Sequence, residues 1–158
     1  MQKITPFLRF DTQAEEAANL YTSVFKNSKI TSVQRYPEGG PMPAGGVMTV
    51  AMELHGIEFV ALNAGPMFKF TEAVSFVINC DTQEEVDYYR EKLTADGGEE
   101  SQCWWLKDKF GLSWQVVPTQ MNKYFSGPDA EANKRAMQAM MQMKKLDLNV
   151  IKQAYENA

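Results

Sequence analysis

The sequence predicts an α+β fold in which one strand–helix–strands unit occurs twice. The first observation is a repeat, since FDTQAEE over Phe10–Glu16 returns as CDTQEE over Cys80–Glu85. The second is its setting, because each copy follows a short apolar stretch and opens an amphipathic one. A tandem repeat of this kind predicts a pseudo-symmetric domain with a cleft between its halves.

The repeated motif is typical of the start of a helix. Thr12 and Thr82 are candidate N-caps, and Glu15 and Glu85 follow three residues later, which is the spacing of a capping box. Each copy is therefore expected to mark a junction between a strand and a helix. In this interpretation the carboxylates start helices and carry no acid–base chemistry.

The first module is predicted over about residues 1–65. A strand over residues 4–10, a helix over 12–25 and a strand over 29–36 come first, from the spacing of their apolar and β-branched residues. A Gly/Pro loop over 37–46 then leads into a hairpin of two strands, 47–54 and 58–63. The hairpin turns at His55-Gly56, so His55 is interpreted as a surface turn residue.

The second module, over about residues 73–118, repeats this order. Strands are predicted over 74–80 and 112–117, with a helix over 82–94 between them. Residues 99–106 fit either one long strand or two short ones. Helices over 129–145 and 147–155 complete a C-terminal extension, about 119–158, that has no counterpart in the first module. Its Met137, Met140 and Met141 could line a partner-binding groove, but packing on the domain or across a dimer is favoured.

Composition and charge argue against nucleic-acid and membrane partners. A formal net charge of −4 and the lack of a basic stripe argue against a nucleic-acid partner. No stretch approaches the ~20 apolar residues that span a bilayer, and no signal peptide is evident, so no membrane partner is expected. Cys80 and Cys103 have neither metal nor redox spacing, which favours a reducing cytoplasm.

Five segments stand out in the chain: ITPFL at 4–8, FKFTEAVSF at 68–76, WLKD at 105–108, WQVVP at 114–118 and MQAMM at 137–141. These segments resemble the PhnB-like branch of the glyoxalase/vicinal-oxygen-chelate superfamily. The resemblance covers nearly the whole chain and implies a single glyoxalase-like domain. That domain would hold two βαβββ modules of glyoxalase/bleomycin-resistance/dioxygenase type with curved mixed sheets. It also implies a homodimer.

This branch often carries the label 3-demethylubiquinone-9 3-methyltransferase domain, which the sequence does not favour. A common methyl-donor site needs a glycine-rich turn between a strand and a helix. Here the glycine-rich segment Gly39–Gly46 lies between two predicted strands, and two prolines remove backbone donors from it. We therefore interpret it as a loop.

The resemblance also locates the positions where metal-using relatives carry His and Glu. They fall near Ile4, Ser75 and Gln115, with the remaining one at Leu62 or Asn63. These side chains lack the charge that holds a divalent ion, so no metal and no cofactor are expected. PhnB-like sequences also often have His where Met67 stands, Trp where Arg9 stands and Gly where Trp104 stands, which puts a shared catalytic role in doubt. Arg9 could face a ligand anion, but a pair with a surface carboxylate is favoured.

The predicted ligand-binding residues are Asn63, Ser75 and Gln115, with Phe70 and Trp114 near them. The resemblance implies that Asn63, Ser75 and Gln115 point inward together, because Ser75 and Gln115 fall at ligand-equivalent positions. Strand alternation makes Trp114 the weakest member. An uncharged polar trio with aromatic walls is typical of a small-molecule pocket, although the same residues could form a packed core.

The sequence thus predicts a cytoplasmic homodimer that binds a small organic molecule without a metal, and it leaves catalysis undecided. Two alternatives remain open. One is a metal-dependent lyase or dioxygenase of the superfamily, and the other is a resistance protein that sequesters a small toxic compound.

Overall fold

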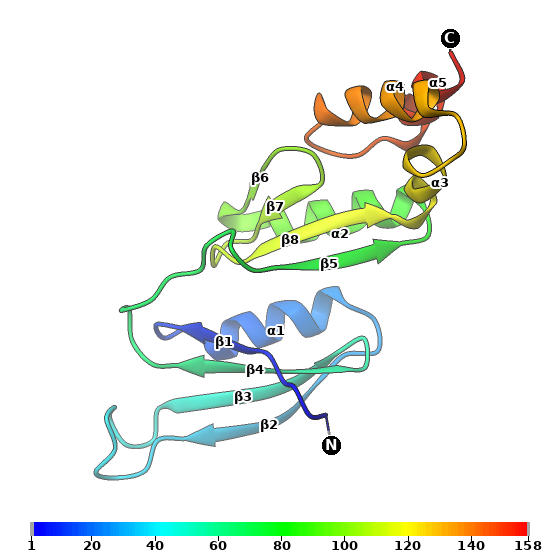
Figure 1. Ribbon diagram of the computed structural model, residues 1–158. Helices are drawn as coiled ribbons and strands as arrows, with labels where there is room; N and C mark the ends of the chain where they lie inside the picture. The colour runs from blue at the N-terminus through cyan, green and yellow to red at the C-terminus, as the bar shows by residue number, and fades with distance from the viewer. Residues whose placement is uncertain (1, 158) are drawn as a thin grey trace. The chain divides into compact units, whose positions relative to one another are not determined.

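The computed structural model describes residues 2–157. The chain divides into two compact units, residues 1–69 and 70–158. Each unit has a four-stranded mixed sheet with a helix packed on one face (Figure 1). The division falls at Lys69–Phe70, in the segment that separates the two predicted modules.

The first unit has the element order strand, helix and three strands. Its elements are β1 (Phe7–Phe10), α1 (Ala14–Val24), β2 (Lys29–Arg35), β3 (Val47–Leu54) and β4 (Ile57–Asn63). The sheet order is β1-β4-β3-β2, with β1 parallel to β4 and the other pairs antiparallel. The β3–β4 hairpin turns at His55 and Gly56, whose φ angles of 49° and 84° suit a tight hairpin turn. The turn interpretation of His55 is therefore confirmed.

Helix α1 packs on one face of this sheet because its small and aromatic residues recur at helical spacing. Ala17, Ala18 and Tyr21 are fully buried on that face of the helix. Val50 and Met52 of β3 are also fully buried, two residues apart on the same side of the pleat. This alternation fixes which residues of the first sheet form its core.

The second unit repeats the same order. Its elements are β5 (Ser75–Cys80), α2 (Gln83–Thr94), β6 (Glu99–Glu100), β7 (Trp105–Lys107) and β8 (Ser113–Pro118), in the sheet order β5-β8-β7-β6. Residues 99–106 therefore contain two short strands rather than one. The segment between them includes Cys103, a non-glycine residue with a φ of 60°.

The two helices start in different ways. Thr82 caps α2 as predicted, because its side chain accepts a hydrogen bond from the Glu85 N–H at 3.2 Å. The expected cap at Thr12 is wrong. Helix α1 begins after Gln13, whose side chain makes no cap hydrogen bond, and Asn63 Oδ1 accepts the Ala14 N–H at 2.8 Å instead. A buried amide from the neighbouring strand supplies the acceptor that the exposed threonine was expected to provide.

The C-terminal extension is helical, as expected. After a 3₁₀ turn (Thr119–Met121) it contains α3 (Asn122–Phe125), α4 (Ala130–Met141) and α5 (Leu148–Glu156). Helix α4 ends earlier than the predicted residue 145. Asp129 and Asp147 cap α4 and α5. The methionine stripe divides, since Met140 is buried whereas Met137 and Met141 are 41% and 62% exposed.

Among residues 2–157, no helix is long and apolar enough to cross a membrane.

Candidate functional site

The two sheet faces of the second unit differ in character. Ser75 is opposite Ser113 in the β5–β8 register, and Gln115 is opposite both Val77 and Trp105. These five residues share one face because side chains alternate along each strand. We call this the site face. The other face packs toward α2 and holds the buried residues Ile78, Cys80, Leu106, Trp114 and Val116.

Gln115 is the centre of a hydrogen-bond chain on the site face. Its Nε2 donates to Ser75 Oγ at 2.8 Å, and its Oε1 accepts from Trp104 Nε1. An indole N–H can only donate, so the oxygen of the amide must face Trp104 and the NH₂ group must face Ser75. The prediction that Ser75 and Gln115 come together is confirmed by this contact.

The same chain determines what Ser75 can offer a ligand. Its oxygen accepts from Gln115, so its own proton is free to be donated. Within residues 2–157 the hydroxyl donates to no other protein atom. Ser75 is only partly buried. The site face therefore presents a hydroxyl donor whose orientation is imposed by a fixed amide.

Ser113 is a residue that the sequence reasoning did not select. It is fully buried and is the direct neighbour of Ser75 across β5 and β8. Its Oγ has no hydrogen-bond partner within the described chain. An unsatisfied buried hydroxyl costs about 1–3 kcal/mol, so an internal ordered water would stabilise it. The available signal was strand alternation, which puts Ser113 on the same face as Gln115.

Trp114 does not lie with Ser75 and Gln115. It is 3% exposed on the opposite face of the sheet, where its Nε1 donates to Asp108 Oδ2 at 2.9 Å. The other oxygen of Asp108 accepts from the backbone N–H groups of Phe110 and Leu112. Trp114 thus helps to hold the β7–β8 turn and faces away from Ser75 and Gln115 because of the pleat of the strand, and its contact with a ligand stays a prediction.

Asn63 belongs to the first unit, where both the oxygen and the nitrogen of its side-chain amide form hydrogen bonds. Its Oδ1 caps α1 and its Nδ2 donates to the backbone oxygen of Val47 at 3.1 Å. The side chain is 7% exposed. The structure thus gives Asn63 a role in joining helix and sheet, and its contribution to a ligand site stays a prediction. Phe70 is partly buried at the start of the second unit, and its role likewise stays a prediction.

Arg9 does not form the expected pair with a carboxylate. Its Nη2 donates to the backbone oxygen of Ala64 at 2.5 Å, and its guanidinium carbon lies 4.8 Å from the centre of the Phe68 ring. Among residues 2–157, no Asp or Glu forms an ion pair with it. The guanidinium is placed by a carbonyl and an aromatic ring.

Lys107 adds a charge to the site face, opposite Ser113 in the β7–β8 register. It forms an ion pair with Glu72. The hydrogen bond between the two side chains lowers the pKa of Glu72 and raises the pKa of Lys107. Both groups therefore stay charged at neutral pH, which leaves neither suited to proton transfer there.

The residues at the metal-equivalent positions do not fit a divalent ion. Ile4 has no donor atom and is 85% exposed. Ser75 and Gln115 carry no charge and use their polar atoms on each other and on Trp104. Across residues 2–157, no three His, Cys, Asp or Glu side chains are grouped as metal ligands would be. We derive no chemistry through a metal.

The core position of Cys80 makes it a poor nucleophile. Cys80 and Cys103 are both free thiols. Burial raises the pKa of Cys80 to about 12, so this side chain is an uncharged thiol at neutral pH. Cys80 is therefore a small apolar core residue, as its position at the end of an apolar strand indicates.

Two units with the same strand–helix–strands order, each with a mixed sheet, define a glyoxalase-type fold. The sequence model of the family described as 3-demethylubiquinone-9 3-methyltransferase matches residues 2–117. The chain belongs to this PhnB-like family, within the glyoxalase/vicinal-oxygen-chelate superfamily.

Solved structures agree with this assignment. A PhnB protein of Bacillus cereus is 39% identical, with a TM-score of 0.67 over 75% of this chain and 100% of its own. A protein of Pseudomonas aeruginosa is 20% identical, with a TM-score of 0.59 over 75% of this chain and 98% of its own. The fosfomycin resistance protein FosX of Listeria monocytogenes is 14% identical, with a TM-score of 0.51 over 75% of this chain and 94% of its own. The last two likenesses show the fold alone. No curated protein matches the chain.

Proposed function

We propose that the protein binds a small organic molecule through a hydrogen-bond acceptor, such as a carbonyl, hydroxyl or amide oxygen, at Ser75. The main support is the fixed orientation of the Gln115 amide, which leaves the Ser75 proton free on the site face. The unpartnered Ser113 hydroxyl lies beside it but is fully buried, so Ser75 is the proposed contact. Each hydrogen bond would contribute roughly 0.5–1.5 kcal/mol net.

Apolar surface on the same face supports binding of an organic molecule rather than a simple ion. Val77 is 49% exposed and Trp105 is partly buried, and both flank Gln115 in the sheet. Apolar walls with a few oriented polar groups are typical of small-molecule sites. Ser75, Ser113 and Gln115 do not titrate near neutral pH, so they favour binding over acid–base catalysis.

A methyltransferase activity is not supported by the first unit. Gly39–Gly46 lies in the connection between strands β2 and β3, and no helix follows it directly. Backbone N–H groups at a helix start are what would meet the methyl donor in a common site of that kind. The family description is therefore no guide to the chemistry of this chain.

Two alternatives are tested together with the main proposal. The first is a metal-dependent lyase or dioxygenase, and the second is a resistance protein that sequesters a small toxic compound. Elemental analysis of protein purified without a His-tag, showing about one metal per chain, would favour the enzyme. Binding without turnover would favour sequestration. We further propose a homodimer in the cytoplasm, for which the exposed Met137 and Met141 offer an apolar surface on α4.

The test is ligand-observed NMR with a panel of small carbonyl and amide compounds. We expect Ser75→Ala to weaken the binding of any hit by about 2- to 12-fold, the equivalent of one net hydrogen bond. Ser32→Ala is the matched control, since Ser32 is an exposed serine on β2 of the first unit. Equal affinity of the Ser75→Ala and Ser32→Ala variants would contradict the proposal.

A further inference from the structure

The C-terminal extension lies beyond the residues that the family model matches. The family match ends at residue 117. The Bacillus cereus relative is covered over its full length by 75% of this chain. The helices α3, α4 and α5 follow that point and belong to the second unit.

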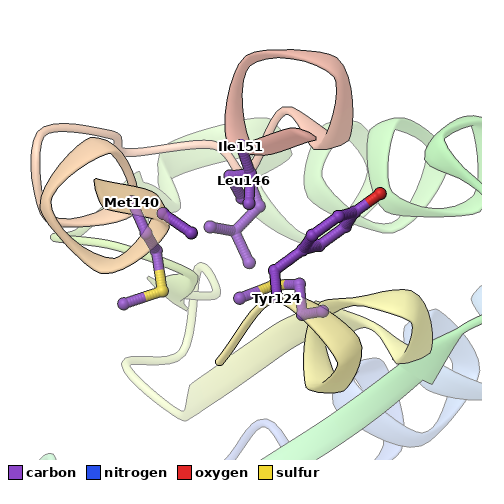
Figure 2. Close-up of a cluster of buried hydrophobic side chains, with 6 residues drawn as sticks. Tyr124, Met140, Leu146 and Ile151 are labelled. Carbon is purple, nitrogen blue, oxygen red and sulfur yellow. The ribbon is translucent and has the colours of Figure 1, made fainter. Parts of the chain in front are cut away.

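The extension has its own apolar core, which we call the C-terminal cluster. Its buried members are Met121, Tyr124, Ala136, Met140, Leu146 and Ile151. Four of them, from the three helices and the α4–α5 connection, converge in Figure 2. Trp104, in the connection between β6 and β7, packs against this cluster. Val117 of β8 packs against it as well, so Trp104 and Val117 both join the sheet to the extension.

Backbone hydrogen bonds fix the segment around Trp104. The Cys103 N–H donates to the backbone oxygen of Met143 in the extension at 2.8 Å, and the Val116 N–H donates to the Trp104 oxygen at 2.9 Å. Cys103 has a φ of 60°, a conformation that costs a residue with a side chain of order 1–3 kcal/mol. The extension therefore contributes to holding a backbone conformation that is unfavourable by itself.

Helix α2 makes a second set of contacts with the extension. Gln83 Nε2 donates to the Leu146 backbone oxygen at 2.8 Å, and its Oε1 accepts the Leu148 N–H at 3.0 Å. Lys145 pairs with Asp87 at 3.1 Å. The start of α5 is thus held on α2, so the C-terminal cluster presents a fixed surface to Trp104.

From these contacts we infer that the C-terminal extension is a support for the ligand site and that Trp104 is its positioning residue. The extension holds the indole, the indole N–H holds Gln115 Oε1, and Gln115 Nε2 holds Ser75. The inference rests on the proposed function for its ligand. The chain of contacts itself can be tested without one.

The indole selects between two orientations of the Gln115 amide. With the N–H of Trp104 present, the amide oxygen faces the indole and Ser75 must accept from Nε2. Without it, the amide can turn so that its oxygen accepts the Ser75 proton. Ser75 would then no longer donate to a ligand, because its one proton is used. The extension therefore sets the site to recognise a hydrogen-bond acceptor.

The direct test is Trp104→Phe, which keeps an aromatic ring against the cluster and removes only the N–H. In ¹⁵N-labelled protein we expect the Gln115 side-chain amide signals to shift. Their exchange with water should be faster by about 2- to 12-fold, the equivalent of one lost hydrogen bond. Trp114→Phe is the control, because it removes an indole N–H on the opposite face of the sheet, and it should leave the exchange rate of the Gln115 amide unchanged. Unchanged Gln115 signals in Trp104→Phe would overturn the inference.

The role of the extension needs a variant that does not touch the site. Met140→Ala opens a cavity in the C-terminal cluster, and Met52→Ala opens a matched one in the first unit, since both methionines are buried. We expect both to lower stability and only Met140→Ala to alter the Trp104 indole and Gln115 signals. If Met140→Ala does not fold, Gln83→Ala releases α5 from α2 and should alter the same signals.

The outcomes separate this inference from the proposed function. Equal Gln115 spectra in the Met140→Ala and Met52→Ala variants would overturn the supporting role of the extension. If Trp104→Phe changes the Gln115 amide but leaves ligand affinity intact, the positioning role stands and the proposed ligand contact at Ser75 fails. If Trp104→Phe changes the Gln115 amide and also weakens ligand affinity, both proposals are supported.

Discussion

Asn63 Oδ1 accepts a hydrogen bond from the Ala14 N–H at 2.8 Å, so the last residue of β4 caps a helix that begins 49 residues earlier in the chain. The same side chain donates to the Val47 oxygen on β3. One amide therefore joins the helix, its own strand and the neighbouring strand of the first unit. A polar residue that resembled part of a ligand site is thus a structural link.

We predict that Asn63→Ala lowers the free energy of unfolding by about 1–3 kcal/mol. The substitution leaves the Ala14 N–H and the Val47 oxygen without this partner in a buried setting. Thr12→Ala is the control and should change stability by less than about 0.5 kcal/mol, because Thr12 is not the cap. Urea titration measures both. Equal destabilisation by the two substitutions would contradict the assignment of the cap.

In the second repeat the threonine itself is the helix cap, so its substitution should lower stability. Thr82→Ala removes the acceptor of the Glu85 N–H and should cost about 1 kcal/mol. Thr12→Ala again serves as the matched comparison, since it changes the same residue type in the same repeat position. A urea midpoint that does not move for Thr82→Ala would remove the capping interpretation. Ligand affinity is expected to stay constant in both variants.

We expect substitution of Trp114 to lower stability and substitution of Trp105 to weaken ligand affinity. Trp114→Phe removes the donor to Asp108 Oδ2 in a buried position and should lower stability by about 1–3 kcal/mol without changing ligand affinity. Trp105→Phe changes the site face and should weaken ligand affinity with little loss of stability. Thermal unfolding and ligand titration of each variant check this. The reverse pattern would place the ligand on the α2 side of the sheet.

The raised pKa of Cys80 predicts a loss of stability at alkaline pH. The ordinary pKa of 9.0 in the unfolded chain rises to about 12 on folding because of burial. Between these values the unfolded state has lost the proton and the native state retains it, so stability falls as pH rises. The slope should approach about 1.4 kcal/mol per pH unit. Cys80→Ala removes the thiol, so a variant with the same slope as the parent would contradict this origin.

The homodimer is tested by sedimentation at micromolar concentration. We expect a species of twice the 17.9 kDa chain mass. Met141→Lys is the informative variant, because this residue is 62% exposed on α4 and a charge there should weaken an interface that uses that helix. Sedimentation of the parent chain only as the 17.9 kDa species would rule out the dimer at that concentration.

The sequence by itself determined the features that depend on local pattern. The repeat at Asp11 and Asp81 predicted two similar units, and helical spacing placed α1 and α2. The family resemblance, together with strand alternation, predicted that Ser75 and Gln115 share a face, and the structure joins them by a hydrogen bond. Such patterns follow from the geometry of one helix or strand, so a short stretch of chain contains all the information.

Tertiary structure alone decided the partners of the polar side chains. Asn63 became a helix cap because the end of β4 meets the start of α1. Trp114 donates a hydrogen bond to Asp108 across a turn, and Trp104 donates one to Gln115. These contacts depend on which elements meet in space. A side chain with several possible partners is assigned to one of them only when the backbone has brought that partner within hydrogen-bond distance.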